Sequence, residues 1–277
     1  MAKWEDRVLN YLGFPEGIDG VTLLTRGMDQ AAQYGVELIE DEVQSLSRNR
    51  SAFHLRGTRG SYESKRVLMA TGLTHLPPNI SGVKECLGKS LFFCKDCDAH
   101  RLQGKRIVIM GRNNEAVDYA LGMLVFTPYV MLATNGATAG WDDDHAAWLQ
   151  EYKIHVRRDK VRLLKHHDGH LDGIDFVTGK PAHADAIFTT RGDVPHSALA
   201  QGVGALLDEE GQIIVDACLR TNVPGLYAAG CVTAANCQMI IAAGQGAIGG
   251  QAINRDLFEE SLRLHTLPRF ETPIHEN

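Results

Sequence analysis

Short apolar runs, separated by segments rich in glycine and polar residues, divide this chain into strands and helices. Arg106–Met110 has the length and apolar character of a buried strand, and Gly111 and a helical pattern from about 115 to 125 follow it. A second strand at 129–133 completes a β–α–β unit. Further short strands are expected at 154–156, 174–177, 186–189 and 226–229. This alternation predicts an α/β fold.

The amino-terminal part of the chain shows a helical pattern and then a hairpin. A helix is expected from Leu23 to Tyr34, with a short strand at Val36–Glu40 after it. Four residues are spaced to form one buried face of that helix: Leu23, Leu24, Met28 and Ala31. Phe53–Arg56 and Glu63–Met69 are expected to pair as a hairpin around Gly57–Gly60.

A helix that begins near Gln238 is unusually rich in small residues. These are Ala242, Ala243, Gly244, Gly246, Ala247, Gly249 and Gly250. Glycine inside a helix costs about 1 kcal/mol relative to alanine, so such a run usually has a reason. It either lets a backbone or a ligand approach closely or allows close packing of the helix on a sheet.

Composition and charge narrow the class of protein. The chain has 277 residues, enough for two domains, with 44% hydrophobic and 22% charged residues. Its net charge of −6 argues against a nucleic-acid-binding protein. There is no apolar run of membrane-spanning length and no signal-peptide pattern at Met1, so we expect a cytoplasmic protein without a membrane segment. Its six cysteines would then stay reduced unless catalysis cycles them.

Cys94-Lys95-Asp96-Cys97-Asp98 is the clearest chemical motif in the sequence. A Cys-x-x-Cys pair can cycle between dithiol and disulfide, with one thiol attacking and the other resolving. Asp98 could move the proton that this chemistry requires, or it could cap a helix. A zinc site would need further ligands, and no second Cys-x-x-Cys occurs, so we expect no metal. Two unreactive buried cysteines are the remaining alternative.

Three blocks in order along the chain together resemble the low-molecular-weight thioredoxin reductase family of pyridine-nucleotide flavoproteins. They are Ala70-Thr71-Gly72, Cys94–Asp98, and Leu226–Val232 followed by Cys237-Gln238 and Ala242-Ala243-Gly244. The resemblance implies two Rossmann-like domains, of which the FAD domain is split by an inserted NAD(P) domain. The implied boundaries are 1–76 and 194–277 for the FAD-type domain and 77–193 for the inserted one.

The resemblance also implies roles for individual residues. Cys97 would face the flavin and Cys94 would attack a thioredoxin-like or other small disulfide protein, with the chain acting as a homodimer. FAD would be held by Ala70, Thr71, Gly72, Gly230, Cys231, Gln238, Met239 and Ala242. NADPH or NADH would be held by Gly111, Asn113, Asn114 and Ala116.

This chain departs from the family's pattern at both cofactor sites. We find no opening βαβ unit with a Gly-x-Gly-x-x-Gly turn, so the FAD-type domain is expected to lack that unit. Cys231 stands where the family has an aspartate. Asn113 adds a side chain where a pyrophosphate needs close approach, and Glu115 adds negative charge. About twenty residues further on, Thr134-Asn135-Gly136 supplies neither an acid for a ribose nor an arginine for a 2′-phosphate.

Three interpretations therefore remain open from the sequence. The chain could be a flavin-dependent disulfide reductase whose true amino terminus lies upstream of Met1. It could be a cofactor-poor relative that acts as a binding or regulatory protein. It could also bind FAD incompletely and take electrons from a donor other than NADPH. The intact dithiol favours the first and third, whereas Cys231, Cys237 and Asn113 favour the second.

Overall fold

The computed structural model describes residues 7–49, 52–190 and 192–268, which divide into two compact units. Unit 1 comprises Met1–Glu37 and Thr74–Val194, and unit 2 comprises Leu38–Leu73 and Pro195–Asn277. The chain passes from unit 1 to unit 2 between Glu37 and Leu38, and it passes between the units twice more within the short strands β5 (Leu73–His75) and β14 (Asp193–Pro195), which pair with each other.

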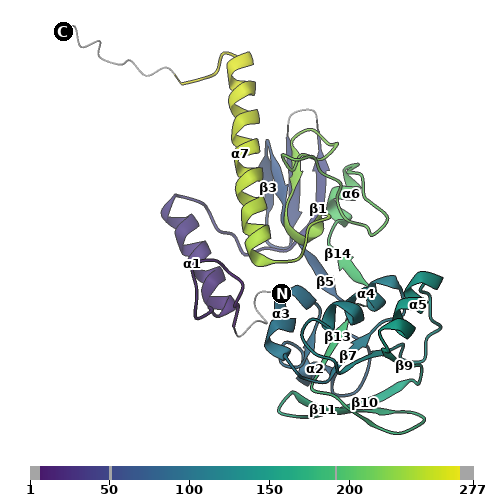
Figure 1. Cartoon of the computed structure of the whole chain (residues 1–277). Helices are drawn as coiled ribbons and strands as arrows, with labels where there is room; N and C mark the ends of the chain where they lie inside the picture. Colours follow the sequence, from purple (N-terminus) through teal and green to yellow (C-terminus); the bar gives the residue numbers. More distant parts are fainter. Residues whose placement is uncertain (1–6, 50–51, 191, 269–277) are drawn as a thin grey trace. The chain divides into compact units, whose positions relative to one another are not determined.

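A five-stranded parallel sheet forms the centre of unit 1 (Figure 1). Its strand order is β6-β13-β7-β8-β9, and every neighbouring pair is parallel. The strands are β6 (Leu91–Phe92), β7 (Ile107–Met110), β8 (Val130–Ala133), β9 (His155–Arg157) and β13 (Ala186–Thr189). The predicted α/β fold and the β7–α4–β8 unit are confirmed.

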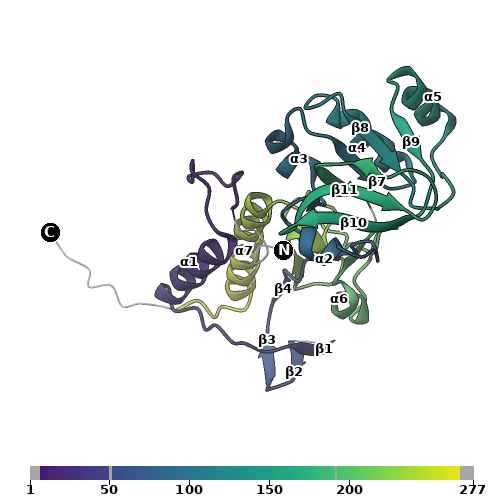
Figure 2. The same cartoon turned by 90° about the horizontal axis from the view of Figure 1, so that it is seen from below.

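Different layers cover the two faces of this sheet. Side chains of β7 alternate between the faces and therefore contact both layers. Ile107 and Ile109 pack in one core with α4 (Asn114–Met123) and α5 (Asp143–Glu151). Val108 and Met110 pack in another core with β10 (Val161–His167) and β11 (His170–Phe176). Figure 2 shows β10 and β11 side by side from below. The smaller elements of unit 1 are α2 (Val83–Cys86), α3 (Lys95–Asp98), the 3₁₀-helix η2 (Ala99–Leu102) and β12 (Ala182–His183).

The amino-terminal expectations are only partly met. Helix α1 (Gly20–Gln33) forms, but its expected buried face does not, since Leu24 is 39% exposed and Met28 49% exposed. No strand forms at Val36–Glu40, where Ile39 is 52% exposed. A strand needs a hydrogen-bonded neighbour, and none of the described residues supplies one for this segment.

Unit 2 combines an antiparallel sheet, a parallel strand pair and a long helix. The antiparallel sheet contains β1 (Val43–Arg48), β2 (Phe53–Gly57) and β3 (Ser61–Ser64). The parallel pair is β4 (Val67–Met69) with β15 (Leu226–Ala228), and their buried side chains share a core with Phe53. The helices are α6 (Ala198–Gly202), the 3₁₀-helix η3 (Gly230–Val232) and α7 (Met239–Arg263).

The predicted hairpin is correct at its turn but wrong at its second strand. Residues 63–69 do not form one strand, because β3 ends at Ser64 and β4 begins at Val67. The Ser64 hydroxyl donates to the carbonyl of Arg66 over 2.6 Å and turns the chain there. As a result β4 leaves the hairpin and pairs with β15 instead.

No helix within the described ranges combines the length and the apolar character that crossing a membrane requires.

Candidate functional site

The Cys94-x-x-Cys97 motif forms a disulfide in unit 1, directly after β6. The Cα atoms of the two cysteines are 5.3 Å apart, and Cys94 occupies the N-cap position of α3. The backbone N–H of Cys97 donates to the Cys94 sulfur over 3.1 Å. Both cysteines are half-buried, so the bond is accessible to a reaction partner.

The fold holds this disulfide against helix α4. Phe92, at the end of β6, packs on Phe188 with ring centroids 5.4 Å apart. The Tyr119 hydroxyl of α4 donates to the carbonyl of Phe93 over 3.2 Å. The side chain of Lys95 lies so close to α4 that a Cβ atom added at Gly122 would be 3.1 Å from its Cδ. The segment that carries the two cysteines is therefore fixed from both sides.

The Asp98 side chain is buried beside the disulfide and forms an ion pair with Arg101. Burial raises the pKa of this carboxyl, while the Arg101 guanidinium opposes the rise. Asp98 is the N-cap residue of η2, but its side chain makes no capping hydrogen bond, so its contacts give no support to a capping role. A carboxyl that keeps its proton to a higher pH is suited to proton transfer at the sulfurs.

The structure also shows a histidine–carboxylate pair next to the motif that the sequence did not reveal. His75 Nδ1 lies 2.6 Å from Asp193 Oδ1. The His75 ring stacks on Phe93, with centroids 4.4 Å apart and planes 9° from parallel. Phe93 directly precedes Cys94. No local pattern signals this contact, because His75 and Asp193 meet only when β5 pairs with β14.

The four residues expected to hold a nicotinamide nucleotide all lie in unit 1, Gly111 and Asn113 in the turn between β7 and α4 and Asn114 and Ala116 in the first turn of α4. Asn113 is the N-cap of α4, and its side-chain oxygen accepts from the Ala116 N–H over 3.3 Å. Asn114 donates to Asp142 over 2.7 Å and accepts from the Asp142 N–H over 3.0 Å. Gly111 is packed too tightly for a side chain, since an added Cβ would be 2.5 Å from that of Ala116.

The residues expected to hold FAD all lie in unit 2. Ala70-Thr71-Gly72 follows β4 and Gly230-Cys231 follows β15. Because the two strands are parallel, both segments lie at the same edge of the pair, where the carboxyl ends of the strands meet. Gly72 and Gly230 both have positive φ, 66° and 75°, a conformation that glycine adopts readily. An added Cβ at Gly72 would meet nothing within 4 Å. This edge is open beside Gly72.

The start of α7 completes this part of unit 2. Gln238 is the N-cap residue and makes no capping hydrogen bond with its side chain, and Met239 is the first residue of the helix. The Ala242 methyl lies 3.5 Å from the position that a Cβ of Gly230 would take. Gln245, which the sequence did not single out, accepts from the Gly230 N–H over 2.6 Å.

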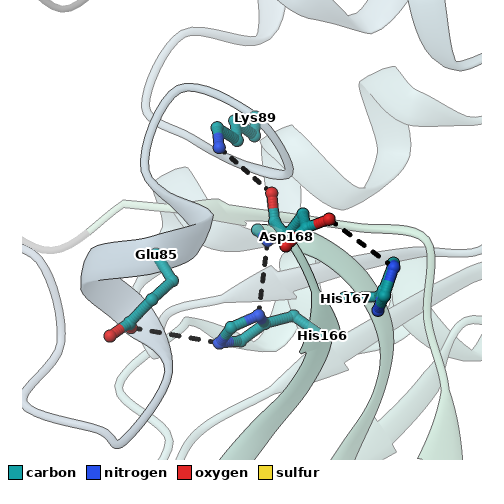
Figure 3. A pocket seen from close by; sticks show the side chains of 6 residues that line it. Glu85, Lys89, His166, His167 and Asp168 are labelled. Atoms are coloured by element: carbon teal, nitrogen blue, oxygen red, sulfur yellow. Dashed lines mark hydrogen bonds and ion pairs between the residues drawn. The ribbon is translucent and has the colours of Figure 1, made fainter.

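A polar hollow of about 490 Å³ lies elsewhere in unit 1 (Figure 3). It is lined by Glu85, Lys89, His166, His167, Asp168 and Gly169. Lys89 Nζ donates to the Asp168 carbonyl over 3.0 Å, and His166 Nδ1 accepts from the Gly169 N–H over 3.3 Å. His166 Nε2 lies 4.0 Å from a Glu85 carboxylate oxygen, and His167 Nε2 lies 3.5 Å from one of Asp168. Among the described residues, no group of three or more His, Cys, Asp or Glu side chains is placed to hold a metal ion.

Comparison with known proteins finds a family match and similar sequences over most of the chain. The family model of the pyridine nucleotide-disulphide oxidoreductases matches residues 6–248. The thioredoxin reductase of Treponema pallidum (strain Nichols) is 28% identical over 263 residues, which cover 89% of this chain and 82% of that protein.

Two solved structures show the same fold over nearly the whole chain. The crystal structure of HlmI has a TM-score of 0.89 and 26% identity, covering 95% of this chain and 84% of that one. The putative thioredoxin reductase TrxB from Bacillus anthracis has a TM-score of 0.84 and 25% identity, with coverages of 94% and 87%. The chain thus belongs to the pyridine nucleotide-disulphide oxidoreductase family and is a thioredoxin reductase-like oxidoreductase.

Proposed function

We propose that this chain is a flavin-dependent oxidoreductase whose Cys94–Cys97 pair passes two electrons to the disulfide of a small thioredoxin-like protein. The observation that carries the proposal is the accessible Cys94–Cys97 disulfide beside the buried carboxyl of Asp98. Thioredoxin reductases that resemble the chain over most of its length support the same class of reaction.

The chemistry of the dithiol needs only these side chains and the partner. In the reduced chain, the Cys94 thiolate attacks one sulfur of the partner's disulfide, forming a mixed disulfide and releasing one partner thiolate. The Cys97 thiolate then attacks the Cys94 sulfur, which restores the Cys94–Cys97 bond and releases the second partner thiolate. Two electrons have moved, and protons from the surroundings neutralise the partner's thiolates.

Residues around the pair prepare it for this exchange. The Cys97 N–H, which donates to the Cys94 sulfur, would also stabilise the Cys94 thiolate. Asp98, with its raised pKa, can deliver a proton to a departing thiolate or take one from an incoming thiol. Tyr119 holds the backbone of Phe93 and His75 stacks on its ring, so both limit the movement of the adjacent Cys94.

The residues present in unit 2 fit a flavin nucleotide at the edge formed by β4 and β15. Ligands of α/β folds bind at the carboxyl ends of parallel strands, and here the backbone at Gly72 is not covered by side chains. FAD would be held there by the segments 70–72 and 230–231 and by the start of α7. When bound, it would supply the two-electron chemistry that reduces the disulfide.

The organisation of the molecule forms part of the same proposal. We take 77–193 as the inserted domain that carries the redox pair, and 1–76 with 194–277 as the FAD-type domain. A homodimer in the cytoplasm completes the proposal. The resemblance to thioredoxin reductases supports this organisation, and the reduced state expected of Cys86 and Cys218 in that compartment agrees with their being free thiols.

Trapping the mixed disulfide tests this proposal. The Cys97→Ser variant should accumulate a covalent adduct between Cys94 and oxidised thioredoxin, because the resolving thiol is absent. The adduct should disappear on addition of dithiothreitol and should be visible by mass spectrometry of the tryptic peptides. Cys218→Ser, which removes a free cysteine of unit 2, is the matched control and should trap nothing. If Cys97→Ser forms no adduct, the Cys94–Cys97 pair does not act on protein disulfides.

A further inference from the structure

The turn before α4 is the place where a dinucleotide-binding fold holds a pyrophosphate, and its N–H groups normally do so. In this chain the Asn113 side chain already accepts from the Ala116 N–H. Asn113 has an ordinary extended conformation, with φ at −112°, so its side chain is accommodated without strain. The turn therefore satisfies part of its own hydrogen-bonding capacity and adds side-chain atoms where a phosphate would need access to the backbone.

The charge in front of α4 is unfavourable for a phosphate as well. Glu115 lies in the first turn of the helix. Partial desolvation and, to a smaller extent, the carboxylates of Asp193 and Asp118 raise its pKa, while a hydrogen bond with Asn113 lowers it. Arg112 is the single cation in the sequence from 111 to 118, against two acids. A dinucleotide pyrophosphate would bring two more negative charges to this place.

The segment after β8, which reads the ribose in such folds, is bound to the same turn. The Gly140 N–H donates to the Arg112 carbonyl over 2.6 Å, and Asp142 exchanges two hydrogen bonds with Asn114. Thr134 directly follows β8 but is buried, and its hydroxyl has no hydrogen-bond partner among the described residues. That hydroxyl is neutral and offers no charge to a 2′-phosphate.

We propose that the turn at Gly111–Ala116 does not bind a nicotinamide dinucleotide, and that Asn113 and Glu115 are the residues that exclude it. The family's usual cofactor and the groups present at this turn thus disagree. The inference concerns nucleotide binding alone, so it stands or falls independently of disulfide exchange at Cys94 and Cys97.

Direct binding measurements on the full chain test the inference. NADPH and NADH are titrated separately against the wild type, by calorimetry and by the change in nicotinamide fluorescence. Neither should show saturable binding up to about 1 mM, which corresponds to less than about 4 kcal/mol of binding free energy. The double variant Asn113→Gly/Glu115→Thr should bind at least about tenfold more tightly, and added salt should weaken this binding.

Two further variants complete the design. Glu151→Thr removes the same charge at the far end of α5 and should leave nucleotide binding undetectable. If the double variant does not fold, Glu115→Gln changes only the charge and should still strengthen binding severalfold. Saturable binding of either nucleotide to the wild type below about 1 mM would overturn the inference. So would a folded double variant, or a folded Glu115→Gln, that binds no better than the wild type.

Discussion

Burial is the main influence on the pKa of the Asp98 carboxyl, which lies next to the Cys94–Cys97 disulfide. Asp98 is 8% exposed, whereas Asp96 on the same short helix is exposed. Burial raises the pKa of Asp98 even though Arg101 forms an ion pair with it. The sequence predicted Asp98 as a proton carrier only from its position next to Cys97. In the structure, desolvation raises the pKa of this carboxyl, and the proton-transfer role itself stays a prediction.

Replacing Asp98 with asparagine should slow disulfide turnover by about 10²–10⁴-fold, the usual contribution of a general acid. Because its pKa is raised in the folded protein, the wild-type activity should fall as pH rises through that pKa, and this fall should be absent in Asp98→Asn. Asp96→Asn is the control and should keep the wild-type profile. A pH–rate profile over single turnovers measures both effects. Unchanged rates in Asp98→Asn would exclude proton transfer by this residue.

Contacts between distant residues explain why sequence analysis found only part of the site. Cys94, Cys97 and Asp98 are adjacent in the chain, so their motif is visible without a structure. His75 and Asp193 are 118 positions apart, and only the pairing of β5 with β14 brings them together. Such a pair carries no local pattern that could have predicted it.

Strands could be predicted from the sequence where the burial of apolar residues alone determines them. Strands β7 and β8 are short and continuously apolar, β13 is apolar up to Thr189, and all three are largely buried, which is the pattern of parallel sheets. Strand β10 was missed because charged and histidine residues interrupt it, and only Val161 and Leu164 are buried. The strand expected at 36–40 has the right composition but no partner among the described residues, and propensity cannot replace a partner.

A polar cluster around Asp256 helps to fix helix α7 to the rest of unit 2. Arg220 donates to both oxygens of Asp256, over 2.9 and 2.6 Å, and the Tyr227 hydroxyl of β15 also donates to Asp256. The Arg220 contact lowers the pKa of Asp256 to about 2. Desolvation of the Tyr227 hydroxyl and, next, its hydrogen bond to Asp256 raise the pKa of Tyr227 to about 12. This carboxylate joins the helix to the strand that precedes the proposed flavin edge.

The Asp256→Asn variant should lower the free energy of unfolding by about 1–3 kcal/mol, because hydrogen bonds to a charged group are lost. The pKa of Asp256 is lowered in the folded state, so its contribution is present above the ordinary value of 3.8 and is lost as pH falls toward 2. Urea unfolding at pH 7 and at pH 2.5 should show a difference between wild type and variant that shrinks at the lower pH. Glu259→Gln, on the exposed side of α7, should cost little at either pH. An equal difference at both pH values would contradict the assigned role.

At the scale of the whole molecule, the Cys94–Cys97 disulfide and the edge proposed to bind a flavin belong to different units. Unit 1 carries the disulfide together with the turn that we infer to exclude a dinucleotide, and unit 2 carries the edge that fits a flavin. The family resemblance predicted both cofactor sites, but it could not show that Asn113 already accepts from the Ala116 N–H. The family match therefore extends over residues 6–248, while each cofactor site has to be judged on its own residues.

Electron transfer from the reduced chain to oxidised thioredoxin tests the central claim most directly. The chain is reduced with dithiothreitol, freed of reductant and mixed with an equal amount of oxidised thioredoxin, and accessible thiols are then alkylated and located by mass spectrometry. We expect Cys94 and Cys97 to lose their reactivity together, one pair for each thioredoxin disulfide reduced, while Cys86 and Cys218 remain unchanged. If Cys94 and Cys97 stay alkylatable and thioredoxin stays oxidised, this pair is not the centre that reduces protein disulfides.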